Sequence, residues 1–315
     1  MLKMQNLEAV KDREGYDRWH QVSCRNYSYC EARRDSDYPF SAQISSWRFG
    51  ALGFSDGRLS SDLTQLDRGP AEIRKDPRDH FMLYLVLLGG VCLTQDGREA
   101  RAQSGDLFLY DQAQPFTLKF RQDYRAIMVN IPRPLLISRL PRARGLTARR
   151  IAGDSKLGAL AGTIVRQITK FGEPADTHVI DRLGSSALDI LATTMEAELA
   201  GPPEVGCARE RLLTQVKSYI LAHLHRSDLD IETIAKAQNI APRTLNRLFA
   251  IDGTTPIRWL WEQRLLACYK ALAEGHVCRV TDAAVSFGFT DMSHFSRAFK
   301  NSFGMSPHLI RRSRH

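Results

Sequence analysis

The last third of the chain contains an imperfect repeat, which constrains the fold more than any other feature. In each copy an alanine stands four residues before a residue that tolerates a positive φ: Ala235 precedes Asn239, and Ala284 precedes Gly288. The small alanine lets a second helix approach the first, and Asn or Gly makes the tight turn between them. The repeat therefore predicts two helix-turn-helix units, the second with one more residue in its turn.

The predicted units cover about residues 231–250 and 280–301, and their second helices also agree. Both contain an apolar-x-Arg-x-Phe sequence, which places Arg247 and Arg297 at equivalent positions. Gly-x-Ser/Thr-Pro follows in each copy and predicts a helix stop, an N-cap and a new helix. The helix between the copies, Pro256 to about Ala273, would be about 27 Å long. Second helices about 34 Å apart would enter successive major grooves on one face of B-DNA.

This region resembles the AraC/XylS family of bacterial transcription regulators, from about Leu213 to Arg314. The resemblance rests on the segments Arg243–Phe249, Gly253–Pro256, Arg264-Leu265 and Gly288–Pro307. It implies that double-stranded DNA is a partner, and that RNA polymerase is another if the protein is an activator. The chain departs from the family at Ala241-Pro242, where a serine is frequent, and this change affects a cap or a phosphate contact.

Eight residues of the second helices are the predicted DNA contacts. Arg247 and Arg297 would each donate two hydrogen bonds to a guanine, at O6 and N7. Residues earlier in these helices would reach base edges or phosphates, and Lys300 would act as a point charge on a phosphate. The full set is Arg243, Asn246, Arg247, Met292, Ser293, His294, Arg297 and Lys300. The alternative is a merely solvated helix face. The nearby aromatic residues Phe249, Trp259, Phe289 and Phe299 are predicted to be core.

The distribution of charge agrees with a nucleic-acid-binding C-terminal region. The chain has 44 Lys and Arg against 35 Asp and Glu, a net charge of +9. Between Cys207 and His315 there are 16 basic and nine acidic residues, so +7 of this excess lies there. A basic module joined to a near-neutral one indicates one end that binds a polyanion and another with a different task.

The sequence from about Phe40 to Ile131 has the pattern of short β-strands separated by turns. Leu83–Leu88 and Val91–Leu93 are predicted to form a hairpin, followed by a type I′ turn signal at Asp96-Gly97. Ser104-Gly105-Asp106 predicts a further turn, and Arg125–Ile131 a further strand. Many short strands without intervening helices are typical of a sandwich or a small barrel.

This half resembles the cupin-like sensor domain of one branch of the same family. The matching segments are Gln95–Ala100, Ser104–Asp111 and Gln114–Phe116. The resemblance implies that the domain senses a small organic effector and takes part in dimerisation. The strand register is needed to say which residues face the interior, because a one-residue slip exchanges the two faces. The effector-binding residues therefore stay unknown at this level.

Two helices are expected after the strands, at about Lys156–Phe171 and Thr177–Leu199. The second has an approximate apolar face, which would pack either on the barrel or on a second subunit. Its members are Ile180, Leu183, Ala187, Leu188, Ile190, Leu191 and Met195. Gly201–Gly206 is a linker by composition.

The predicted fold class is thus α+β with two domains. A cupin-like β-barrel (residues 1–145) is followed by a helical connector and linker (residues 146–206). An all-α double helix-turn-helix domain (residues 207–315) completes the chain. The predicted function is a sequence-specific, DNA-binding transcription regulator that acts as a homodimer and is activated by a small organic effector.

Two other functions remain open: an effector-independent repressor or architectural protein, and a cupin-type enzyme fused to a DNA-binding module. The chain lacks the Gly-x-Ser-x-Gly, P-loop and Rossmann motifs, so no catalytic residue is assigned. The histidines and the six scattered cysteines form no recognisable ligand set, so we expect no metal and no cofactor. Residues 1–16 have no apolar signal region, and no apolar run reaches the roughly 20 residues of a membrane span. We therefore expect a cytoplasmic protein without a membrane partner.

Overall fold

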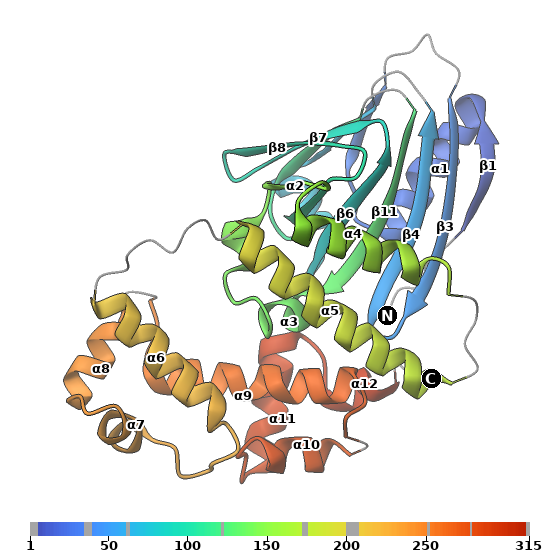
Figure 1. Ribbon diagram of the computed structural model, residues 1–315. Coiled ribbons are helices and arrows are strands. Elements are labelled where there is room, and N and C mark those ends of the chain that lie inside the picture. Colours follow the sequence, from blue (N-terminus) through green and yellow to red (C-terminus); the bar gives the residue numbers. More distant parts are fainter. Residues whose placement is uncertain are drawn as a thin grey trace. The chain divides into compact units, whose positions relative to one another are not determined.

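The computed structural model describes residues 6–34, 40–60, 64–120, 123–171, 176–199, 208–250, 253–277 and 279–312. The chain divides into two compact units, Met1–Gly201 and Pro202–His315. The first unit is rich in strands and the second is helical (Figure 1), as the predicted α+β class requires. The predicted linker at residues 201–206 lies outside the described residues.

The strands of the first unit form two antiparallel sheets. The larger contains, in order, β1 (Leu7–Lys11), β3 (Ser41–Phe49), β4 (Leu52–Ser60), β11 (Tyr124–Pro132), β6 (His80–Leu88), β9 (Leu107–Asp111) and β12 (Arg150–Ile151). The smaller contains β2 (Glu31–Arg34), β5 (Thr64–Arg68), β10 (Phe116–Phe120), β7 (Gly90–Gln95) and β8 (Arg98–Gln103). No ladder joins the two sheets among the described strands, so the predicted closed barrel is wrong in this respect and the unit is a two-sheet sandwich.

The predicted hairpin between Leu83–Leu88 and Val91–Leu93 is also wrong. β6 pairs with β11 and β9 in the larger sheet, whereas β7 pairs with β10 and β8 in the smaller one. The chain changes sheets at Gly89, which has a φ of 75°. Only glycine adopts this left-handed backbone conformation without strain. The hairpin of this region is β7–β8, where Asp96 and Gly97 both have positive φ, as the type I′ signal predicts.

The larger sheet is buried on both faces. Its inner face contributes Met82, Tyr84 and Val86 of β6 to a core shared with the smaller sheet. The alternate residues Leu83 and Leu85 are also buried, on the outer face. Both faces of β6 are therefore apolar, which produces the continuous hydrophobic run in the sequence.

Helices cover the outer face: α3 (Arg133–Ile137), a short 3-10 helix (Ala143–Leu146), α4 (Lys156–Ile168) and α5 (Thr177–Leu199). α4 and α5 lie across the larger sheet (Figure 1). Glycines allow the close approach, since a Cβ at Gly184 of α5 would lie 2.9 Å from the carbonyl oxygen of Phe49. Of the predicted apolar face of α5, Leu183 and Ile190 are exposed and the other five residues are buried.

Three α-helices in this unit were not expected from the sequence: α3, described above, α1 (Asp12–Asn26) and α2 (Pro70–Lys75). α1 packs against β1 and β3, and α2 follows β5. The buried positions of α1 are Gly15, Trp19, Ser23 and Asn26. They follow helical spacing, but only one is a large apolar residue, so the amphipathic pattern is weak.

The second unit consists of α6 (Ala208–Ala222), α7 (Ile231–Ala237), α8 (Pro242–Phe249), α9 (Pro256–Ala273), α10 (Val280–Ser286), α11 (Met292–Phe303) and α12 (Pro307–Arg312). One core joins Val216 and Ile220 of α6 to Leu245 and Phe249 of α8. The second half is held by aromatic contacts, with ring centroids 4.8 Å apart for Phe289–Phe295 and 4.6 Å for Phe299–Phe303.

Candidate functional site

The two predicted turns have the backbone that a helix-turn-helix requires. Asn239 and Gly288 have φ values of 53° and 77°. After each turn the chain returns a hydrogen bond to the alanine of the motif: the amides of Ile240 and Phe289 donate to the carbonyls of Ala235 and Ala284, each at 3.0 Å. Both alanines are buried between the helices that the turn joins.

α8 has one buried side and one exposed side. Leu245, Leu248 and Phe249 are buried, as the sequence predicts for Phe249. The predicted contacts Arg243, Asn246 and Arg247 are all exposed. Their spacing of three and four residues puts them on one face of the helix.

α11 repeats this arrangement at the equivalent place in the second helix-turn-helix. Phe295 and Phe299 are buried, while the predicted contacts Ser293, His294, Arg297 and Lys300 are exposed and Met292 is half-buried. Phe289 is buried and packs against Phe295, and Trp259 is half-buried and packs against Phe249, so both lie on the core side of the second helices. Each second helix thus presents a polar or cationic surface opposite its core.

The exposed side chains make local contacts within their own helices. The Asn246 amide donates to the carbonyl of Pro242 at 3.2 Å, and Arg297 Nε donates to the carbonyl of Ser293 at 3.4 Å. Asp291 caps α11 by accepting from the amides of Ser293 and His294 at 2.7 and 3.0 Å. These two backbone hydrogen bonds hold the pKa of Asp291 below its usual value.

Arg264 of α9 supports this arrangement, and the sequence analysis gave it no role. Its side chain is 2% exposed, and it donates to the carbonyls of Leu224 (3.1 Å) and Arg226. Its guanidinium lies 5.1 Å from the centre of the Trp261 ring, which packs against His294 at 5.5 Å. Arg264 therefore connects the end of α6 to the beginning of α11. Its signals in the sequence are its place in the family segment Arg264-Leu265 and its spacing, four residues after Leu260 and four before Cys268 on the buried side of α9.

A second candidate site lies between the two sheets of the first unit. It is a cavity of about 40 Å³, lined by two residues of α1, by Tyr27 directly after this helix and by residues of both sheets. The lining includes Trp19, Ser23, Tyr27, Leu59, Leu66, Tyr84, Phe120, Tyr124 and Met128. We call this the interior cavity.

The interior cavity is lined mainly by apolar and aromatic residues, together with a few hydroxyl groups and Arg58. The Tyr124 side chain is 5% exposed, and its hydroxyl makes no hydrogen bond to any part of the chain that the structure describes. Burial raises the pKa of Tyr124 well above its ordinary value, so this phenol is neutral. A buried hydroxyl without a partner is costly, which makes it a place where a ligand would form a hydrogen bond.

No helix among the described residues is long and apolar enough to cross a membrane. The described His, Cys, Asp and Glu side chains also form no group of three or more that would hold a metal ion.

Comparison with known proteins identifies both halves. The AraC-binding-like domain family matches residues 19–196, and a helix-turn-helix domain family matches residues 234–313. The transcriptional activator NphR of Rhodococcus sp. is 33% identical over 314 residues, which cover 97% of this chain and 93% of NphR. XylDLEGF operon transcriptional activator 1 of Pseudomonas putida is 24% identical over 237 residues, or 70% of this chain and 72% of that protein.

A solved structure supports the same fold. The AraC-like transcriptional activator CuxR superposes with a TM-score of 0.55 at 19% identity, over 85% of this chain and 96% of its own. The paired helix-turn-helix units, the matched sensor domain and the similarity along almost the whole of NphR agree with one another. The chain therefore belongs to the AraC/XylS family of DNA-binding transcription regulators.

Proposed function

We propose that this protein is a cytoplasmic transcription activator. It binds two successive major grooves of double-stranded DNA through α8 and α11 and responds to a small organic effector in its first unit. The observation that carries the proposal is the equivalent placement of Arg247 and Arg297, each exposed on the second helix of its own helix-turn-helix. Activation is inferred from NphR and implies RNA polymerase as a further partner.

The DNA contacts that we propose are the eight residues predicted from the sequence. Arg247 and Arg297 read guanine edges, since an exposed guanidinium on a recognition helix matches O6 and N7. Arg243, Asn246, Met292, Ser293 and His294 lie earlier in α8 and α11, at base edges or phosphates. Lys300, two turns into α11, neutralises a phosphate.

The interior cavity is the proposed effector site. A volume of about 40 Å³ accommodates little more than one water molecule, whereas organic ligands occupy about 300 Å³ or more. Effector binding therefore requires the lining residues to separate, and Met128 is the most adaptable of them. This requirement makes the site a sensor, because a ligand that binds only the expanded form shifts the population toward it. The first unit then acts as a sensor and not as an enzyme.

We further propose that the protein dimerises through α5. Val179, Leu183 and Ile190 are exposed by 47%, 40% and 41%, although all three are large apolar residues. Their spacing of four and seven residues places them on one face of the helix. A second copy of the chain, bringing the same face of its own α5, would cover this stripe in a two-fold interface.

The experiment that tests the proposed function is selection of bound sequences from a random DNA library by the full-length protein. We expect an enriched site with two elements about 10 base pairs apart. Arg247→Ala should relax the sequence of one element only, and Arg297→Ala that of the other only. An absence of enriched sequences, or loss of both elements in each variant, would contradict the assignment of one recognition helix to each element.

A further inference from the structure

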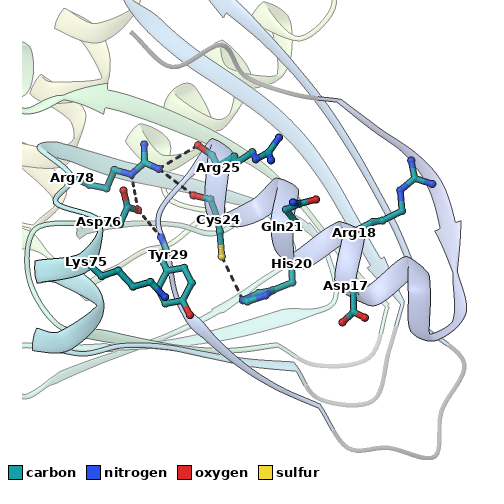
Figure 2. A pocket seen from close by; sticks show the side chains of 10 residues that line it. All are labelled: Asp17, Arg18, His20, Gln21, Cys24, Arg25, Tyr29, Lys75, Asp76 and Arg78. Atoms are coloured by element: carbon teal, nitrogen blue, oxygen red, sulfur yellow. Dashed lines mark hydrogen bonds and ion pairs between the residues drawn. The ribbon is translucent and has the colours of Figure 1, made fainter.

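A second, larger cavity opens on another face of α1. Its volume is about 700 Å³. α1 contributes Asp17, Arg18, His20, Gln21, Cys24 and Arg25, and the remaining lining residues are Tyr29, Lys75, Asp76 and Arg78 (Figure 2). We call it the outer cavity. Trp19 and Ser23 of the same helix line the interior cavity, so α1 is a wall of both cavities.

Cys24 and His20 form a close pair in the outer cavity (Figure 2). Cys24 Sγ lies 3.4 Å from His20 Nε2, one helical turn away. The same nitrogen lies 2.8 Å from the carbonyl oxygen of Cys30. A carbonyl only accepts hydrogen bonds, so His20 Nε2 donates to Cys30, and the Cys24 sulfur lies beside the same nitrogen. The imidazole of His20 therefore contacts both the Cys24 sulfur and the Cys30 carbonyl.

The electrostatics of His20 agree with this geometry. The hydrogen bond with Cys24 is the main cause that raises the pKa of His20 above its ordinary value, and burial opposes it. The Cys30 carbonyl and the charge of Asp17 act in the same direction as Cys24. The Cys24 sulfur is therefore the main interaction partner of the His20 imidazole in the outer cavity.

The lining of the cavity that contains the pair is rich in cations. Cys24 lies in the last turn of α1, where the helix carbonyls would disfavour an anion. Arg78 offsets this effect, because its guanidinium donates hydrogen bonds to the carbonyl oxygens of Cys24 (3.1 Å) and Arg25 (3.4 Å). Arg78 also donates to the Asp76 carboxylate at 2.9 Å. The cavity lining carries four cations (Arg18, Arg25, Lys75 and Arg78) against two carboxylates (Asp17 and Asp76). This excess of positive charge favours an anionic reactant.

The other described cysteines lack such surroundings. Cys30 and Cys268 are buried, and burial raises the pKa of each to about 12. Cys92 is partly exposed, but desolvation and the neighbouring Glu99 raise its pKa. Cys92 is therefore a natural internal control for a partly exposed cysteine without a histidine partner.

We propose that Cys24 is a site of reversible modification by small anionic disulfides. The Cys24 thiol loses its proton to water, and its sulfur attacks one sulfur of the disulfide. A new S–S bond forms as the old one breaks, and the leaving thiolate takes a proton from water. Cys24 is oxidised to a mixed disulfide, and the departing half of the reagent is reduced to a thiol. His20 is the positioning residue that stabilises the attacking thiolate.

The test is the reaction of the reduced full-length protein with oxidised glutathione at pH 7, followed by mass spectrometry of the peptide around each cysteine. Because His20 lies beside the Cys24 sulfur and the cavity lining carries an excess of cations, we expect Cys24 to react about tenfold faster than Cys92. A thiol reductant should reverse the modification. Equal rates for Cys24 and Cys92, or earlier modification of any other cysteine, would overturn the proposal.

Three variants separate the chemical role of His20 from a structural one. His20→Asn should slow the reaction of Cys24 but not that of Cys92, whereas Gln43→Asn, at an exposed position of β3 outside the cavity lining, should leave both rates unchanged. In nuclear magnetic resonance titrations, Cys24→Ser should lower the pKa of His20 toward its ordinary value, which a purely structural contact would not do. With cystamine, a cationic disulfide, the ratio of the Cys24 rate to the Cys92 rate should be smaller than with oxidised glutathione. An unchanged Cys24 rate in His20→Asn, or a stronger preference of cystamine for Cys24, would refute the respective role of His20 or of the cations.

Discussion

Arg297 and Lys300 lie one turn apart on the exposed side of α11, and their replacement should weaken DNA binding in different ways. Arg297→Ala should weaken specific binding by about 1–3 kcal/mol and relax the choice at one base step. Lys300→Ala should weaken binding to all sequences and lower the salt slope by about one unit. Fluorescence anisotropy with matched and mismatched duplexes over a range of salt concentrations measures both effects. Unchanged affinity and preference in a folded Arg297→Ala would remove α11 from the interface.

His80 is the residue whose titration should affect the stability of the first unit. Burial, with smaller contributions from Arg78, Arg133 and Arg48, lowers its pKa from 6.5 to about 4, although Asp79 opposes the shift. Its Nδ1 atom also finds no hydrogen-bond partner in the described part of the chain. In the unfolded chain His80 therefore binds a proton below pH 6.5, whereas in the folded protein it does so only near pH 4.

The stability contributed by a neutral His80 is present above pH 6.5 and is lost as the pH falls toward 4. Between pH 7 and pH 5 the loss should be about 2 kcal/mol. Urea unfolding of the wild type and of His80→Gln at both pH values measures it, and the variant should lose less stability over this interval. Equal losses in the two proteins would show that His80 does not titrate in this way.

At the scale of elements, the turn of the second helix-turn-helix is the most demanding backbone position in the C-terminal unit. Gly288 has a φ of 77°, and an added Cβ would lie 2.9 Å from an Arg264 guanidinium nitrogen and 3.1 Å from the carbonyl oxygen of Leu224. Gly304 ends α11 with a φ of 68°, but an added Cβ there would meet nothing within 4 Å. The two glycines therefore separate backbone strain from crowding.

Gly304→Ala should cost about 1 kcal/mol, from the left-handed backbone alone. Gly288→Ala should cost about 2 kcal/mol or more, because Arg264 must also shift. Thermal unfolding of the two full-length variants compares them directly. Similar losses at both positions would mean that Arg264 moves aside without cost.

The stripe on α5 is the element to which we assign dimerisation. Leu183→Glu together with Ile190→Glu should convert the dimer to a monomer without unfolding it, because both side chains are already exposed in the single chain. Glu196→Lys, at an exposed position on another side of α5, is the control and should remain dimeric. Sedimentation velocity distinguishes the two states. A dimeric double variant would place the interface elsewhere.

At the scale of the whole molecule, each unit contains hydrophobic clusters formed from its own elements. The fragment from Cys207 to His315 should therefore be soluble, helical by circular dichroism and able to bind DNA without effector. The fragment from Met1 to Ala200 should be stabilised against heat by whichever compound induces transcription in cells. Stabilisation of only the C-terminal fragment would contradict the sensor assignment.

Much of the C-terminal unit could be predicted because its signals are local in the sequence. The positive φ of Asn239 and Gly288 follows from the residue types, and the N-cap of Thr255 before Pro256 follows from adjacent residues. The exposed and buried sides of α8 and α11 follow from helical spacing. The role of Arg264 could not be predicted, because its partners are carbonyls about 40 residues away in the chain.

In the N-terminal unit, the sequence by itself determined that strands form and where turns occur, since alternation and turn residues act over a few positions. It did not determine which strands pair. Leu83–Leu88 and Val91–Leu93 are adjacent in the chain and separate at Gly89 into different sheets, a choice made by burial on both faces of β6. α1 could not be predicted from the sequence either, because most of its buried positions are occupied by the small or polar residues Gly15, Ser23 and Asn26. Only the tertiary structure brought this helix between the interior and outer cavities and placed His20 beside Cys24 and Cys30, because cavities arise from contacts between segments that no local pattern encodes.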